Sequence, residues 1–154
     1  MRLDYFQLID RVETLGRAEA AIVVSAVVPT ESTIFEGHFP GHPVMPGVLL
    51  IEAMAQASGY LILALNDFAR MPFLASVKEA KLRSFVAPGT TLSVEAEREH
   101  EGSGYVVMRA RVLAGDERVC NAVLTFRTVA FPSPEVERHV RERAADTGLL
   151  KADG

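Results

Sequence analysis

Hydrophobic residues form their longest nearly uninterrupted stretch between Val48 and Leu65, directly after the turn Met45-Pro46-Gly47. Proline is favoured at the first position of a helix, because the N–H that it lacks would have no partner there. The apolar side chains after Gly47 fall on every side of a helical wheel. The pattern therefore predicts one long helix that is buried all round and ends near Asn66-Asp67.

Two polar residues interrupt the first three turns of this helix, and they lie on one face. Glu52 and Gln56 are four residues apart, so their side chains can hydrogen-bond. A carboxylate inside an apolar helix is costly unless something pairs or uses it. The stretch is long enough to span a membrane, but these two residues and the turn-rich segment before them argue against a span.

Strands are predicted on both sides of the helix from β-branched and alternating apolar residues. The predicted strands are Ala18–Val28, Phe73–Val86, Thr91–His100, Tyr105–Leu113 and Val119–Val129. Short glycine-containing segments join the last three as hairpins. Polar residues alternate with apolar ones along these strands, so one face of their sheet is expected to be buried. We predict an α+β fold in which a curved antiparallel sheet, connected as a meander, wraps round the long helix.

The two ends of the chain carry weaker patterns. Near the N-terminus, Tyr5, Leu8, Ile9 and Val12 fall at helical spacing and predict a short packing helix. Beyond residue 131 the composition shifts, so we divide the chain into a domain, 1–131, and a C-terminal tail, 132–154. In the tail, Ser133–Ala145 is predicted as a surface helix that begins at a cap, and Gly148–Gly154 as a frayed, solvated end.

Composition excludes some function classes. The chain has 154 residues, enough for one domain with a core, and its net charge of −4 does not suggest a nucleic-acid partner. The single Cys120 excludes an internal disulfide and fits a reducing compartment. The first ten residues are polar every few positions, unlike a signal peptide. We expect a cytoplasmic protein. Because one small sheet cannot cover a helix that is apolar all round, we also expect a homodimer.

The segment before the helix carries the most specific signal. It reads Gly-His-Phe-Pro-Gly from Gly37 to Gly41, then Pro-Val-Met-Pro-Gly from Pro43 to Gly47, and the helix continues with Glu-Ala-Met-Ala-Gln at Glu52–Gln56. This segment resembles the signature of the 3-hydroxyacyl-[acyl-carrier-protein] dehydratases, the FabZ-like branch of the hot-dog fold. The resemblance extends over about residues 5–130. A His-Arg-Tyr-Pro motif of that family, expected before Leu8, is absent.

The resemblance implies roles for named residues. His38 would be the general base, Glu52 the general acid and the Gly47 N–H the donor to the thioester oxygen. The Val44 carbonyl would orient the imidazole of His38, and Gln56 would hold the Glu52 carboxylate. Phe39 and Pro46 belong to the same motif as supporting residues. In this family His and Glu come from opposite subunits, and dimers often assemble into trimers of dimers.

The reaction itself explains these residue types. Dehydration removes a proton at C2 of the acyl chain and protonates the departing hydroxyl at C3. The base should titrate near neutrality, which makes histidine the natural choice. The acid must hold a proton at pH 7, and a carboxyl group among apolar side chains can do so because burial raises its pKa. The N–H groups at a helix start stabilise developing negative charge. The reaction needs no cofactor. A metal site at His38 and His42 is not expected, because Pro40-Gly41 breaks the helix that such ligands would share.

Substrate and carrier contacts can be assigned less directly. An apolar seam between helix and sheet, lined by Phe73 and Leu74, would hold the acyl chain. The acyl carrier protein is acidic, so Lys78, Lys81 and Arg83 are candidates for its docking patch, although a solvated strand face explains the lysines equally well.

Several alternatives remain open. The same fold also serves acyl-thioester hydrolases, which would release a free thiol. A dehydratase-isomerase would form a cis-3-enoyl product, but that related branch has Asp at the position of Glu52. A non-catalytic acyl-binding subunit has no reason to keep both His38 and Glu52. For single residues, Glu52 as a paired buried acid and Gln56 as a packing amide are the structural alternatives.

Overall fold

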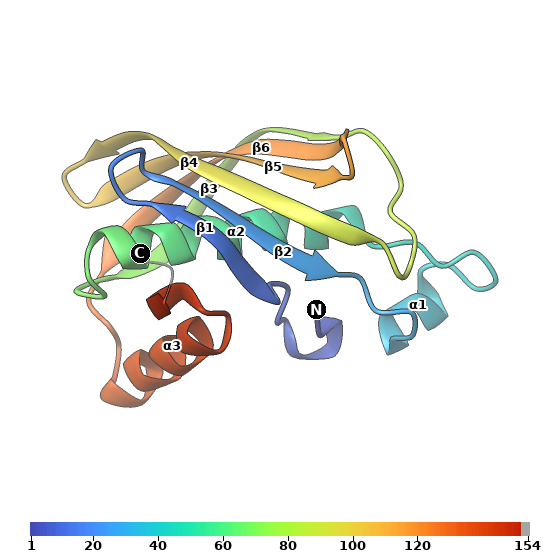
Figure 1. Cartoon of the computed structure of the whole chain (residues 1–154), viewed down its shortest axis with the longest axis horizontal. Helices are drawn as coiled ribbons and strands as arrows, with labels where there is room; N and C mark the ends of the chain where they lie inside the picture. Colours follow the sequence, from blue (N-terminus) through green and yellow to red (C-terminus); the bar gives the residue numbers. More distant parts are fainter. Residues whose placement is uncertain (152–154) are drawn as a thin grey trace.

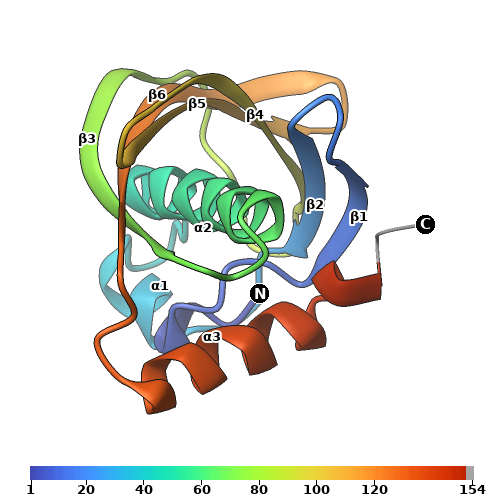
Figure 2. The ribbon, with the colours of Figure 1, turned by 90° about the vertical axis from the view of Figure 1, so that its left-hand side faces the viewer.

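A curved sheet wrapped round one long helix dominates the structure (Figures 1 and 2), a computed structural model that describes residues 1–151. Six antiparallel strands form one sheet in the order β1-β2-β4-β5-β6-β3. The strands are β1 (Arg11–Gly16), β2 (Ala21–Val27), β3 (Met71–Leu82), β4 (Thr91–Gly102), β5 (Tyr105–Ala114) and β6 (Glu117–Val129). The helices are α1 (Thr33–Gly37), α2 (Gly47–Leu65) and α3 (Pro134–Asp146), with short 3-10 turns η1 (Leu3–Tyr5) and η2 (Leu149–Lys151). This is the predicted α+β, hot-dog arrangement.

The sheet buries one face against α2, as the alternation predicts. Leu92, Val94 and Ala96 of β4 are buried, whereas Glu95 and Glu97 point to the opposite face. Successive side chains of a strand point to opposite faces, so a regular alternation places these three apolar residues together on the helix side. The outer face of the sheet is consequently polar and carries charged pairs between strands.

The long helix α2 is largely, but not completely, buried. Twelve of its 19 residues are buried, and the sheet covers that side. Val48, Glu52, Gln56 and Tyr60 are not buried, and their four-residue spacing places them in one stripe along the helix. The prediction of a helix buried all round is therefore wrong for the single chain, because a curved sheet covers a cylinder from one side only.

Segments from both ends of the chain cover part of this stripe. Near the N-terminus, the Gln56 amide hydrogen-bonds to the backbone of Phe6 and Leu8. At the other end of α2, the helix α3 lies beneath it, as Figure 2 shows, and shares a pocket with Tyr60. Val48 remains 69% exposed. The side of the first turn that carries Val48 is therefore the part that the chain leaves open.

Two predictions about the strands need correction. The segment predicted as an N-terminal helix is instead the turn η1 followed by strand β1, which pairs with β2. A bulge between Val12 and Thr14 disrupts the alternation that would have indicated a strand. In addition, β3 does not pair with β4 in a simple meander: it lies at the sheet edge beside β6.

The C-terminal tail is docked rather than solvated. The helix α3 starts at the predicted Ser133 cap, whose hydroxyl accepts a hydrogen bond from the Val136 N–H. Leu149 is only 2% exposed, and the Thr147 carbonyl accepts a hydrogen bond from the Val12 N–H at 2.8 Å. The expectation of a frayed end from Gly148 is thus wrong for residues 148–151. Residues 152–154 lie outside the described part of the chain.

One helix among residues 1–151, α2, has the length and apolarity of a membrane span. Two thirds of that stretch is buried inside the fold. The helix is therefore the core of this domain, in agreement with the sequence prediction.

Candidate active site

The ring of His38 is held in a defined orientation by the loop between α1 and α2. Its Nδ1 lies 3.0 Å from the Val44 carbonyl oxygen, and the Val44 N–H donates back to the His38 carbonyl at 3.0 Å. A carbonyl oxygen can only accept, so this hydrogen bond requires a proton on Nδ1. In the neutral ring, Nε2 then carries the lone pair. The Phe39 ring stacks on the imidazole, with centroids 4.2 Å apart.

The start of α2 leaves backbone donors free close to this loop. Pro46 occupies the N-cap position and provides no side-chain cap, and its carbonyl accepts the Leu49 N–H at 2.9 Å. The N–H groups of Gly47 and Val48 precede this bond and have no intrahelical partner. A Cβ atom added to Gly47 would lie 2.5 Å from a terminal methyl group of Leu82, at the end of β3. The β3 end therefore packs closely over the first turn of α2.

Glu52 and Gln56 are joined as their spacing predicts. The Gln56 amide donates to the Glu52 carboxylate at 3.1 Å and also to the Phe6 carbonyl at 2.8 Å. Its own oxygen accepts the Leu8 N–H at 3.1 Å. The amide thus fixes the Glu52 carboxylate relative to the N-terminal segment.

A pocket of about 400 Å³ lies beside Glu52 and runs along α2, between the helix and the segments from both ends of the chain that cover it there. Glu52, Gly59 and Leu63 of α2 form one wall, and Leu74 of β3 contributes to the opposite one. Burial raises the pKa of Tyr60, another lining residue, against a smaller opposite effect of Arg143. A pocket that begins at a carboxylate and continues between apolar walls can accommodate an alkyl chain next to a polar reacting centre.

The predicted channel residues divide between two faces of β3. Leu74 lines the pocket, but Phe73 is 60% exposed and does not. In the register with β6, Leu74 lies opposite the buried Phe126, whereas Phe73 lies opposite the exposed Arg127 on the other face. Within one chain Phe73 therefore lies outside this pocket. Sequence reasoning also missed the α3 residues of this pocket, because nothing in the tail's sequence indicates where the tail docks.

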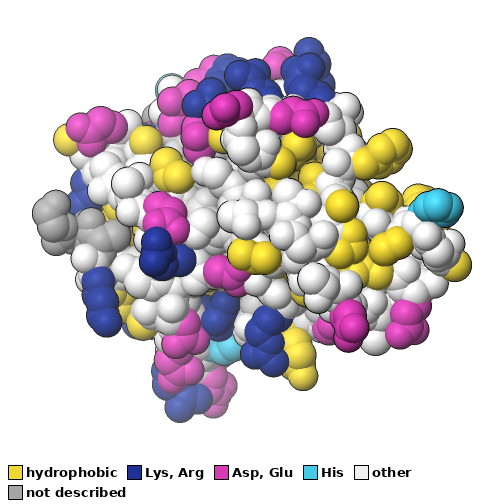
Figure 3. All heavy atoms as spheres, turned by 45° about the vertical axis from the view of Figure 1, so that its right-hand side comes forward, with side chains coloured by type: hydrophobic (Ala, Val, Ile, Leu, Met, Phe, Trp, Pro, Cys, Tyr) yellow, Lys and Arg dark blue, Asp and Glu magenta, His cyan; other side chains and the backbone are white. Residues whose placement is uncertain are grey.

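His38 does not line the pocket that contains Glu52. It lies at the end of the molecule that carries α1, where hydrophobic side chains gather at the surface near a histidine (Figure 3). Exposed apolar residues from this end include Phe39, Val48, Leu82 and Phe85. One chain therefore does not bring the two candidate catalytic side chains together in a common pocket.

The basic residues proposed for carrier docking lie on or just after β3. Lys78, Lys81 and Arg83 are all exposed, and Arg83 donates to the Asn121 side chain at 3.1 Å. Lys81 and Arg83 are the neighbours of Leu82, which contacts Gly47. Lys81 lies opposite Asn121 in the register of β3 and β6, and Asn121 lines a hollow on the outer face of the sheet. The two positive charges therefore lie on the outer side of the β3 end, while Leu82 between them faces α2, and Lys78 is further along the strand.

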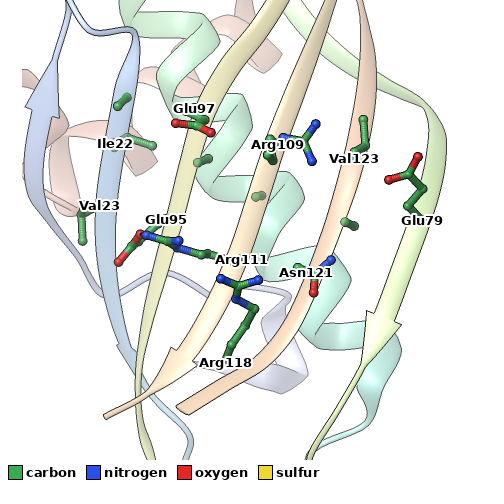
Figure 4. Close-up of a pocket in the computed structure, with 14 residues that line it drawn as sticks. Ile22, Val23, Glu79, Glu95, Glu97, Arg109, Arg111, Arg118, Asn121 and Val123 are labelled. Carbon is green, nitrogen blue, oxygen red and sulfur yellow. The ribbon is translucent and has the colours of Figure 1, made fainter. Parts of the chain in front are cut away.

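A second hollow, of about 260 Å³, lies on the outer face of the sheet (Figure 4). Three arginines and three glutamates line it, among them Arg111, which donates to Glu95 at 2.7 Å. The sheet separates this hollow from α2, and its charges balance. It is therefore distinct from the site beside Glu52.

Comparison with known proteins identifies the class of this chain. Residues 2–123 match the model of the FabA-like domain, and the chain belongs to that family. Its particular similarity is to 3-hydroxyacyl-[acyl-carrier-protein] dehydratases named FabZ. The FabZ of Lactiplantibacillus plantarum is 42% identical over 118 residues, which cover 76% of this chain and 80% of that protein. The FabZ of Symbiobacterium thermophilum is 38% identical over 134 residues, covering 86% and 94%.

Solved structures agree at the level of the fold. A conserved protein of Pseudomonas aeruginosa superposes with a TM-score of 0.62 at 23% identity, covering 77% of this chain and 87% of that one. A hypothetical thioesterase of Streptococcus pneumoniae, solved with coenzyme A, gives a TM-score of 0.61 at 18% identity and coverage of 80% and 88%. At these identities the likeness concerns the fold alone.

Proposed function

We propose that this protein dehydrates (3R)-3-hydroxyacyl thioesters, carried on an acyl carrier protein, to trans-2-enoyl thioesters in fatty acid biosynthesis. Membership of the FabA-like family and the similarity to FabZ enzymes support this reaction. The observation that carries it is the hydrogen bond between His38 Nδ1 and the Val44 carbonyl, since it leaves Nε2 of a neutral ring able to accept a proton.

The chemistry follows from three groups. His38 Nε2 removes a proton from C2, and the electrons of that C–H bond form the new double bond as the C3–O bond breaks. Glu52 gives its proton to the departing hydroxyl, which leaves as water. During the reaction negative charge develops on the thioester oxygen, and the Gly47 N–H at the positive end of α2 stabilises it.

The complete site would form between two copies of the chain. β3 is an edge strand of 12 residues, whose outward backbone groups have no neighbour within residues 1–151. A long unpaired edge is a template for pairing with another chain, and a two-fold dimer brings the same surface of both copies together. The exposed Phe39, Val48 and Leu82 would be covered in such a dimer. His38 of one copy would then face Glu52 of the other.

The acyl carrier protein would dock beside the entrance of this site. Lys81 and Arg83 flank Leu82 and lie on the outer side of the β3 end whose inner side contacts the start of α2. Opposite charges raise the rate of encounter, and here they would offset the net negative charge of this chain. Lys78 would extend the patch along β3. With its single buried Cys120, the protein fits the reducing conditions of the cytoplasm, where we place the reaction.

The direct test is a dehydration assay. Purified protein is given 3-hydroxyacyl chains on acyl carrier protein and on coenzyme A, and enoyl thioester and free thiol are measured. We expect the trans-2-enoyl thioester with loss of water and no thiol release. Release of thiol would instead indicate a hydrolase, and a cis-3-enoyl product a dehydratase-isomerase.

Variants test the assignment of roles. His38→Ala and Glu52→Gln are each expected to lower kcat by at least about a hundredfold while leaving the fold intact. His42→Ala is the matched control, because His42 is an exposed histidine of the same loop. Near-normal turnover in either catalytic variant would overturn the assignment.

A further inference from the structure

The C-terminal tail forms one end of the pocket that begins at Glu52. His139, Val140 and Arg143 of α3 line this pocket together with Tyr60 and Leu63 of α2. The family model ends at residue 123, so α3 lies beyond the part of the chain that the FabA-like family defines. This chain therefore has a pocket wall outside the shared domain.

The residues of α2 give the pocket a direction. Glu52, Gln56, Gly59 and Leu63 follow each other at intervals of three or four residues and all line it. The eleven helical steps from Glu52 to Leu63 correspond to a length of about 16 Å. An acyl chain whose reacting carbons lie at Glu52 would extend along this stripe, and its methyl end would approach α3.

The wall is anchored on both sides of the pocket. Ala144, Thr147 and Leu149 are buried, and the Thr147 carbonyl is hydrogen-bonded to β1. The Arg141 guanidinium lies over the Phe68 ring, 4.9 Å from its centre, just beyond the end of α2. α3 is therefore packed in a defined place against the core.

The chemistry of this wall is unfavourable for a longer alkyl chain. Val140 presents an apolar side chain, but His139 and Arg143 on either side of it are polar. Burying these groups against methylene groups would remove them from water without a new partner, which costs free energy. Arg143 is also held by Asp146 at 3.2 Å, so its position is constrained.

We propose that α3 sets the upper limit of acyl chain length, with Val140 as the residue that the methyl end contacts. This inference rests on the proposed dehydratase function. The tail would then help to determine which substrates the site at Glu52 accepts. A smaller residue at position 140 should shift the preference towards longer acyl chains, and a larger residue should shift it towards shorter ones.

The test compares kcat/KM over a series of 3-hydroxyacyl-[acyl-carrier-protein] substrates, each one acetate unit longer than the last. Val140→Ala is expected to raise kcat/KM for the longest chains about tenfold relative to the wild type, since a methylene group in an apolar pocket has an effect of this size. Val140→Phe should lower it for the same chains by a similar factor. Both should leave the shortest chains unaffected.

Arg138→Ala is the matched control, because Arg138 is exposed and does not line the pocket. Thermal unfolding of each variant checks that α3 remains docked. The same chain-length profile in both Val140 variants and the wild type would overturn the inference while leaving the dehydratase function intact. Absence of enoyl product from every substrate with the wild type would instead overturn the proposed function.

Discussion

The side chain of Gln56 donates to the Glu52 carboxylate at 3.1 Å and simultaneously hydrogen-bonds to the backbone of the N-terminal segment at Phe6 and Leu8. The amide nitrogen and the amide oxygen of Gln56 are therefore hydrogen-bonded at the same time, which fixes the orientation of the side chain. The rotamer of the proposed acid is therefore linked to the position of a segment almost fifty residues away in sequence.

Replacing Gln56 tests this linkage. Gln56→Leu should lower kcat about tenfold or more with little change in KM, because the Glu52 carboxylate loses its orientation but the pocket remains. The variant should also lose about 1–3 kcal/mol of stability, since the Leu8 N–H and the Phe6 carbonyl lose their partner. Steady-state kinetics and thermal unfolding measure the two effects. If the variant were destabilised but its kcat unchanged, Gln56 would have only a packing role and would not position the Glu52 carboxylate.

Mixing two inactive variants tests whether the site spans two subunits. Equal amounts of His38→Ala and Glu52→Gln chains, unfolded and refolded together, should recover about a quarter of the wild-type activity. Half of the random dimers are mixed, and in each of these one of the two sites contains both intact residues. If His38 and Glu52 acted within one chain, every site would lack one residue and mixing would restore nothing.

Introducing charge at the β3 edge tests the dimer itself. Val77→Lys should shift the protein from dimer to monomer in light scattering and abolish turnover at the same concentration, because β3 would carry a buried charge at the interface. Val129→Lys is the control: Val77 and Val129 are 39% and 37% exposed, but Val129 is on β6, away from the edge. A Val77→Lys dimer with full activity would exclude the proposed pairing.

Charge reversal tests carrier docking. The double variant Lys81→Glu, Arg83→Glu should raise KM at least about tenfold for substrates on acyl carrier protein, and the effect should diminish as salt screens the interaction. Coenzyme A substrates should be affected much less. The control is Lys151→Glu, an exposed lysine at the other end of the chain. An equal rise in KM for acyl carrier protein and coenzyme A substrates would mean that the substitutions disturb the acyl pocket and not the docking of the carrier.

Cys120 provides a test of the core that is independent of function. Burial raises the pKa of its thiol to about 11, above the ordinary value of 9.0. A raised pKa in the folded state means that the unfolded state releases its proton first. This contribution to stability is therefore complete below pH 9 and is lost as pH rises towards 11. Unfolding midpoints measured across this range should fall less steeply in Cys120→Ala, and parallel curves would contradict the assignment.

Local signals in the sequence were sufficient for the central part of this fold. The Pro46-Gly47 start and the long apolar run define α2, and the regular alternation of β4 and β5 places each residue on the correct face. Spacing alone placed Glu52 beside Gln56. These features depend on neighbours in the chain, and a sequence records them directly.

The features that the sequence did not reveal depend on distant partners. β3 carries no local signal that it pairs with β6 across the sheet rather than with β4. The strand β1 has few buried residues and a bulge at its centre, so its pattern is also compatible with a helix. In the tail, two small or apolar residues, Ala144 and Leu149, decide that a charged segment docks on the core. A sequence pattern cannot identify the surface that receives them.

The attachment of α3 has a consequence for how such an enzyme could diversify. The groups that we propose for the reaction are on the loop before α2 and on its first turns, whereas the wall at the far end belongs to a terminal segment anchored on β1 and Phe68. On the proposed function, exchange of this segment between relatives would alter the acyl chains that are accepted, without disturbing the residues proposed to break the carbon–oxygen bond.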